Sequence, residues 1–222
     1  MIKKCMKLAA CLLPALFFVG CAHHPAQPYD YTAFKAAQPK SIVVLPPLNN
    51  SPEVKATYGM LSQLSYPLAE AGYYVLPVAA VDETFKQNGL ANAADVHNVS
   101  VQKLHEIFGA DAGLYVTVSK YGAVYTLLNS EVVVAAEAKL VDLKTGTLLW
   151  SGRASASSAE QNNNNAGGGL IGALVAAAVK QIINTSTDAA YPIAGVASGR
   201  LMSVGGGNGI LYGPRSTNYG KP

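Results

Sequence analysis

Charge is scarce in this sequence. Only 13% of its 222 residues are charged, whereas half are hydrophobic. A composition this apolar excludes a disordered chain, a collagen-like fibre and a nucleic-acid-binding arm. The common catalytic signatures are also missing, because there is no phosphate-binding loop, no nucleophile elbow and no paired-cysteine metal site. We therefore predict no catalytic residue, no cofactor and no metal ligand.

The first twenty residues are predicted to be an export signal. Three lysines within the first seven residues precede an apolar run, Leu8–Gly20, of thirteen residues. That run is shorter than the roughly 20 residues that a membrane-spanning helix needs. The signal ends in Phe18-Val19-Gly20-Cys21, which resembles a bacterial lipobox. The sequence thus predicts a lipoprotein signal peptide over residues 1–20 and lipidation of Cys21. The alternative is an ordinary signal peptide with an incidental cysteine.

Cleavage of the signal would change the balance of charges and cysteines. The signal carries three of the 16 basic residues and none of the 13 acidic ones, so the mature chain is neutral. A neutral chain has no electrostatic basis for binding nucleic acid. Cys5 and Cys11 leave with the signal, so only Cys21 remains and no internal disulfide is expected. In the bacterial lipoproteins that the lipobox resembles, an Asp directly after the cysteine favours the inner membrane. Ala22 occupies that position here, so the resemblance implies the periplasmic face of the outer membrane. Acyl chains such as palmitate on Cys21 would anchor the protein there.

The mature chain divides into three parts. Residues 21–40 contain three prolines and no apolar period, which predicts an extended, lipid-anchored tether. Residues 41–203 are predicted to form a single globular domain. Residues 204–222 are rich in Gly, Asn and Ser, which predicts a tail.

Hydrophobic periodicity predicts both strands and helices in the globular domain. Strands are expected at 41–45, 73–78, 114–119, 131–140 and 147–153, the last two joined by a turn at 142–146. Helices are expected at 51–71, 82–88, 100–108, 170–183 and 188–202, with Pro67 and Pro192 breaking the first and the last. Residues 90–99 are interpreted as a loop. This order predicts an α/β (α+β) fold in which helices pack on a mixed sheet.

Three segments of the chain carry a resemblance to a known family: Tyr29-Asp30-Tyr31 with Ile42–Asn50, Ala71–Val78, and Gly109-Ala110-Asp111. In these segments the chain resembles the genome-derived-antigen type of bacterial lipoproteins, whose domain has no established function. The resemblance covers about residues 21–205. It implies a fold similar to the N-terminal domain of the periplasmic protein TolB, to lipoproteins that activate penicillin-binding proteins, and to the globular part of curli-type secretion lipoproteins. These relatives imply protein–protein work at the cell envelope and no catalysis.

Small residues recur at four-residue spacing, which lets two backbones approach closely. They are Gly168, Gly172 and Ala176, then Gly195 and Gly199. One interpretation is tight packing of a helix within its own domain. The other is an interface with a partner helix or a second copy of this chain.

Two functions of different class follow from the sequence. The first is an outer-membrane-anchored, non-catalytic module that binds other envelope proteins in a transport or secretion assembly, with a homo-oligomer as a variant. The alternative is a periplasmic enzyme acting on cell-wall glycan. Such an enzyme needs a pocket with convergent carboxylates or histidines, for instance one lined by Glu131, Glu137 or His105.

Overall fold

The computed structural model describes residues 29–125, 130–162, 188–205 and 207–221. The signal peptide, Cys21 and the helix predicted at 170–183 lie outside these ranges, as do Gly168, Gly172 and Ala176. What the sequence predicts for them stays a prediction.

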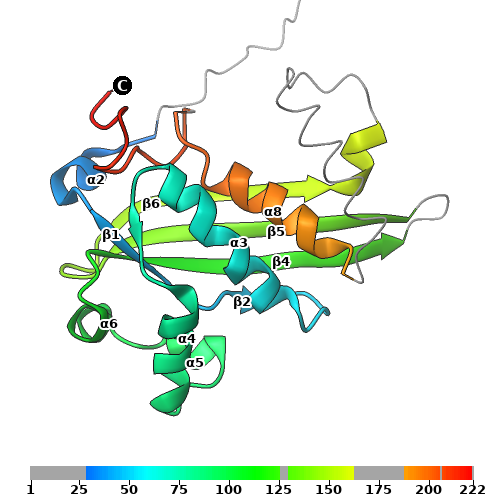
Figure 1. Cartoon of the computed structure of the whole chain (residues 1–222), viewed down its shortest axis with the longest axis horizontal. Helices are drawn as coiled ribbons and strands as arrows, with labels where there is room; N and C mark the ends of the chain where they lie inside the picture. The colour runs from blue at the N-terminus through cyan, green and yellow to red at the C-terminus, as the bar shows by residue number, and fades with distance from the viewer. Residues whose placement is uncertain (1–28, 126–129, 163–187, 206, 222) are drawn as a thin grey trace, which may run out of the picture.

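A single mixed sheet forms the centre of the described molecule (Figure 1). Its main path runs β3-β1-β4-β5-β6, where β1 pairs in parallel with β3 and β4, and β4, β5 and β6 are antiparallel. The short β2 also pairs with β4. The strands are β1 (Ser41–Val44), β2 (Leu48–Asn49), β3 (Tyr74–Val75), β4 (Ala112–Tyr125), β5 (Ser130–Asp142) and β6 (Leu148–Ser157). The predicted mixed sheet with packed helices is confirmed.

Alternating burial along the antiparallel strands follows from their two-residue period. On β5, Ala138 and Leu140 are buried, whereas the residues that precede each of them, Glu137 and Lys139, are exposed. The predicted hairpin also forms. The Asp142 carboxylate accepts hydrogen bonds from the backbone N–H groups of Lys144 and Thr145, at 2.9 and 2.7 Å, and so fixes the turn.

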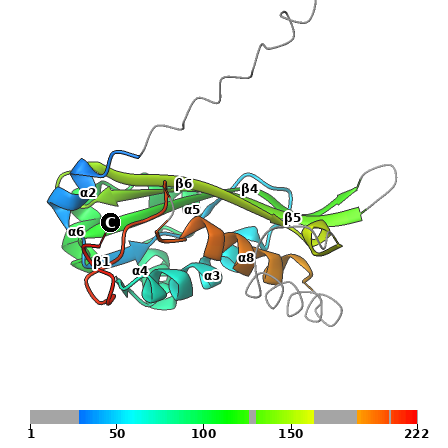
Figure 2. The same cartoon turned by 90° about the horizontal axis from the view of Figure 1, so that it is seen from above.

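Helices cover the two faces of the sheet unequally. Helices α3 (Ala56–Glu70) and α8 (Ala190–Leu201) lie along one side of it (Figure 2). Val43 on β1 and Leu45 just after it point the other way. They join a second core with α4 (Val78–Gln87), α5 (Ala93–His97) and α6 (Val101–Phe108). This second group gathers at the β1 end, so the matching side of β5 and β6 carries no described helix (Figures 1 and 2).

Both ends of the described chain pack against the domain. Helix α2 (Thr32–Ala37), within the predicted tether, buries Phe34. The predicted tail runs back past α2: Ile210 is buried, and the Tyr73 hydroxyl donates to the Leu211 carbonyl at 2.6 Å. Gly72 has φ +97°, and a Cβ there would lie 2.5 Å from the Ser216 nitrogen. Only glycine allows this close approach.

Neither internal proline breaks its helix as predicted. Pro67 removes one backbone donor from the last turns of α3, but the buried Leu64 and Leu68 on either side hold that helix on the sheet. Pro192 lies in the first turn of α8, where backbone N–H groups have no partner within the helix.

Two boundaries in the α4–α5 region also differ from the prediction. The strand expected at 73–78 shortens to two residues, because Pro77 ends it and becomes the N-cap residue of α4 four residues earlier than expected. The predicted loop 90–99 contains α5, whose N-cap, Asn92, accepts a hydrogen bond from the Asp95 N–H at 2.9 Å. A helix this short has a single buried residue, Val96, and leaves no periodic signal.

Candidate functional site

A broad groove of about 1060 Å³ lies over the side of the sheet that α3 and α8 leave uncovered, and continues around its β6 edge. The strand register sets the chemistry of its floor. Tyr115, Lys139 and Ser151 form one cross-strand row, and Thr117, Glu137 and Arg153 form the next. Because neighbouring side chains in such a row lie about 5 Å apart, the floor is a compact polar surface with opposite charges at Glu137 and Arg153.

A half-buried histidine, the last residue of α5, lines the groove. The His97 Nε2 lies 3.0 Å from the Pro46 carbonyl, which can only accept, so this nitrogen carries the proton. Its ring meets the Tyr115 ring edge-on, with centroids 5.3 Å apart. Burial lowers the pKa of His97, although the bond to Pro46 acts against that shift. The histidine is therefore neutral near pH 7 and holds Tyr115 in place.

Side chains rather than another strand cover the free edge of β6. The Ser151 N–H donates to the Tyr29 hydroxyl at 2.9 Å, and the Arg200 guanidinium donates to the Ser155 carbonyl at 2.8 Å. Glu160 accepts from the Ser157 N–H and pairs with Arg200, which holds the pKa of Glu160 below its ordinary value. Such capping prevents unwanted strand pairing at an exposed edge.

The residues that would favour an enzyme do not converge. Glu137 lines the groove and is the only carboxylate among its described lining residues. Glu131 instead accepts from the Ser157 hydroxyl at 2.6 Å, and the His105 Nδ1 lies 2.8 Å from the Ala110 carbonyl. A glycosidase of the common type needs a second carboxylate across the substrate. Within the described ranges, no group of three or more potential metal ligands occurs either.

The predicted small-residue interface is only partly within the described chain. Gly195 faces α3, where an added Cβ would lie 3.1 Å from the Gln63 Oε1. Gly199 has open space around it. Gly195 thus fits packing within the domain, whereas Gly199 leaves the interface prediction untested.

Among the helices of the described ranges, none is long and apolar enough to cross a membrane.

Sequence reasoning missed most of the groove. The alternation of polar and apolar residues along the strands does indicate which side chains share the polar side of the sheet. Three groove residues lie on that side: Tyr115, Lys139 and Arg153. The contacts of Tyr29 and Arg200 with β6 join residues far apart in the chain, and no local pattern reports them.

Similarity to known proteins identifies the family. The family model "Putative lipoprotein GNA1162-like" matches residues 29–215. The chain belongs to this lipoprotein family. It is 51% identical over 204 residues to the curated lipoprotein NMB1124/NMB1162 of Neisseria meningitidis serogroup B, covering 92% of this chain and 94% of that protein. The family predicted from the sequence segments is confirmed.

One solved structure agrees with this assignment. The crystal structure of lipoprotein GNA1162 from Neisseria meningitidis has a TM-score of 0.53 and 55% identity, and the match covers 66% of this chain and 99% of that one. A PelC dodecamer from Paraburkholderia phytofirmans matches with a TM-score of 0.44 and 12% identity over 75% of this chain and 88% of that one. A likeness that weak carries no argument about assembly.

Proposed function

We propose that this GNA1162-like lipoprotein is anchored to the periplasmic face of the outer membrane through Cys21. It acts there as a non-catalytic module that binds another protein of an envelope transport or secretion assembly. The observation that carries this proposal is the groove over the uncovered side of β4, β5 and β6. A solvent-facing sheet that no described helix covers offers a partner a preformed surface.

The side chains at the groove suit a protein partner. Tyr29 and Tyr115 line it together with Arg153 and Arg200, and tyrosine and arginine are enriched where protein interfaces gain most of their energy. The floor also belongs to paired strands, so binding would have little backbone to order.

The charged residues at the groove indicate which chemistry the partner should have. Among its described residues, the groove is lined by three cations, Lys139, Arg153 and Arg200, and by one carboxylate, Glu137. Arg200 is already paired with Glu160, so Lys139 and Arg153 face Glu137 alone and leave one positive charge in excess on the groove floor. An extended segment with acidic residues would complement these two cations, and charge of this kind sets the specificity and the rate of association.

Photo-crosslinking in intact cells tests the proposal. A benzophenone amino acid replaces Thr117 on the groove floor, and the control replaces Tyr66, which is 73% exposed on α3. We expect a reproducible protein adduct from position 117 that is absent from position 66. The adduct should weaken with Lys139→Glu and persist with Lys55→Glu, which changes an exposed lysine away from the groove. Equal capture from both positions would count against a site on this face.

A further inference from the structure

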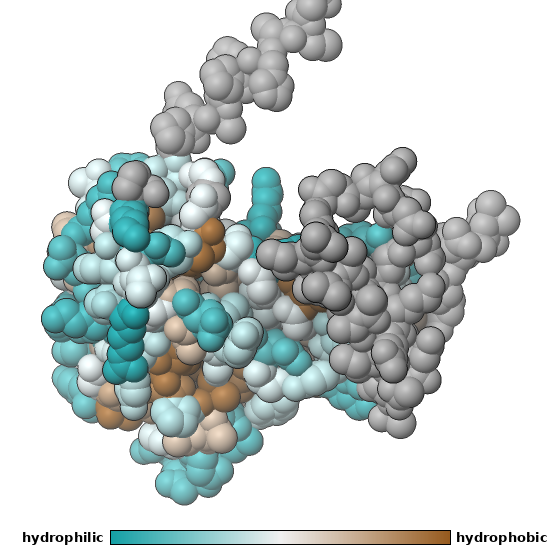
Figure 3. Space-filling view, turned by 45° about the horizontal axis from the view of Figure 1, so that its top comes forward, coloured by the Kyte–Doolittle hydropathy of each residue, from teal (hydrophilic) through white to brown (hydrophobic). Residues whose placement is uncertain are grey.

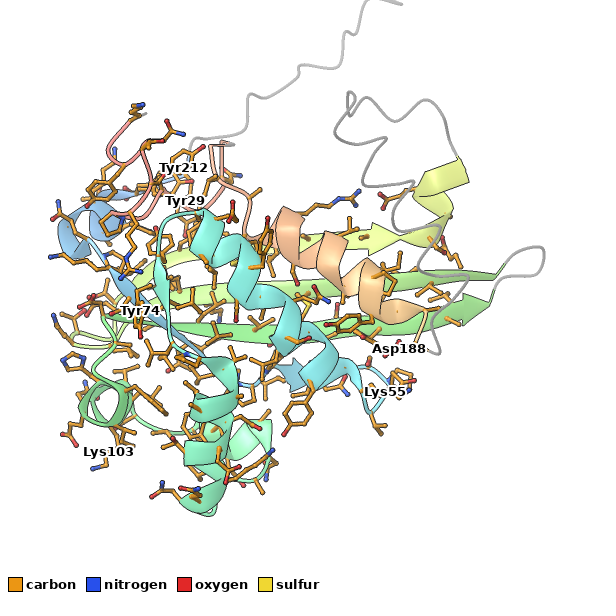
Figure 4. All side chains as sticks on the ribbon, in the orientation of Figure 1. Tyr29, Lys55, Tyr74, Lys103, Asp188 and Tyr212 are labelled. Atoms are coloured by element: carbon orange, nitrogen blue, oxygen red, sulfur yellow. The ribbon has the colours of Figure 1, made fainter. Side chains whose placement is uncertain are left out.

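A second cavity lies at the end of the molecule where the described chain begins. It has a volume of about 580 Å³ and separates α2 from the returning C-terminal segment. Buried Phe34 and Ile210 form part of its wall, and Tyr31, Tyr212 and Tyr219 surround them. Figure 4 shows Tyr212 at the same end of the molecule as Tyr29. A cavity of this size and apolar character suits a small ligand or one hydrocarbon chain.

Two lysines make the cavity amphipathic. Lys35 from α2 and Lys221 from the C-terminal segment line it, and no carboxylate does so among its described residues. Neither ammonium group is in an ion pair with a described carboxylate. On the face shown in Figure 3, hydrophilic and hydrophobic residues are mixed near the start of the described chain. The chemistry that fits is an apolar chain with an anionic head.

The length of the tether limits how far this cavity can lie from the anchoring membrane. Cys21 and Tyr29 are eight residues apart, so the chain can place Tyr29 no farther than about 28 Å from the anchored cysteine. Tyr31, two residues after Tyr29, lines the cavity. If Cys21 is acylated, as the proposed function requires, the cavity stays near a membrane surface at high effective concentration. Tyrosines with lysines are also the residues that settle at membrane interfaces.

We infer that this cavity binds an anionic phospholipid of the anchoring membrane, with an acyl chain against Phe34 and the phosphate near Lys35 and Lys221. Lipid binding would orient the domain at the membrane. The groove lies on the sheet and does not share this cavity's walls apart from Gly209. The domain can therefore contact the membrane and a protein partner at the same time.

Crosslinking of the full chain in intact cells tests this inference. A benzophenone amino acid replaces the 44% exposed Tyr219 at the cavity, with Tyr66 on α3 as the control position. We expect an adduct with the mass of a phospholipid at position 219 and not at 66. Lys35→Gln should lower its yield about fivefold, as expected for one lysine near an anionic surface, while Lys55→Gln should leave it unchanged.

Other results would overturn the inference. Equal phospholipid adducts at both positions would indicate random contact with lipid, and a protein adduct at 219 would indicate a protein partner. A crosslink to the chain's own acylated N-terminal peptide would make the anchor the occupant, and no adduct would leave the cavity without a lipid. The same spectra report acylation of Cys21 on the N-terminal peptide. Failure of the proposed anchoring is thus read separately from failure of lipid binding.

Discussion

The Tyr29 hydroxyl accepts a hydrogen bond from the backbone N–H of Ser151, 122 residues later in the sequence, at 2.9 Å. The first residue of the described chain therefore caps the free edge of the last strand of the sheet. This contact fixes the start of the described chain at the wall of the groove, so the segment that leads to the proposed anchor leaves the domain at a fixed place relative to the groove.

Tyr29→Phe should remove this bond and keep the ring, whose centroid lies 4.9 Å from that of Tyr31. We expect a loss of about 1 kcal/mol in the free energy of unfolding. Amide exchange at Ser151 should also become faster. Hydrogen exchange followed by mass spectrometry measures both effects, with Tyr66→Phe as the control. Unchanged protection at Ser151 would mean that the bond has no part in holding the edge.

Gly72→Ala should detach the C-terminal segment. The added Cβ would lie 2.5 Å from the Ser216 nitrogen in a backbone with φ +97°, so we expect a loss of more than about 2 kcal/mol. Gly89→Ala is the matched control, because φ is +81° there but no atom lies within 4 Å. It should cost about 1 kcal/mol from backbone strain alone. Urea unfolding and limited proteolysis near residue 213 distinguish the two, and equal losses would contradict the packing described.

Stability should fall on mild acidification because of His97. Burial lowers its pKa below the value of about 6.5 expected in the unfolded chain. The unfolded state then binds more protons between the two pKa values, so the stabilisation is complete above about pH 6.5 and declines as the pH falls towards the folded pKa. Urea unfolding at pH 7.5 and 5.5 should show a smaller difference for His97→Gln than for the natural protein. Identical differences would contradict this role.

Cys21→Ser should abolish membrane attachment, because serine offers no thiol for acylation. The mass of the mature chain should lack acyl groups, and the protein should leave the membrane fraction. Unchanged mass and partitioning would contradict lipid anchoring altogether.

The sequence predicts features whose cause is local. Asp142 and Gly146 define a turn within five residues, and alternation along 131–140 distinguishes the buried side of β5 from the exposed one. Helix α6 is also predicted, since its N-cap, Ser100, accepts from the Lys103 N–H and Gly109 ends it with φ +64°. These signals need no knowledge of the rest of the chain.

Features that depend on distant contacts are not predicted. Residues 204–221 have the composition of a tail, yet the Asn208 carbonyl accepts from the Trp150 indole at 3.0 Å and Gly213 bonds to Ala71. Composition cannot reveal such packing, because the stabilising partner lies far away in sequence. The cavity beside α2 exists for the same reason, since it forms only where the two ends of the described chain meet.

The central claim is that the open side of β4, β5 and β6 binds a protein of the envelope through Lys139 and Arg153. The most direct measurement is the affinity of the partner captured from position 117 for the natural protein and for Lys139→Glu with Arg153→Glu. Reversal of two central charges should weaken binding by at least about tenfold, while Lys55→Glu should leave it unchanged. An affinity that is the same for all three proteins would contradict the claim.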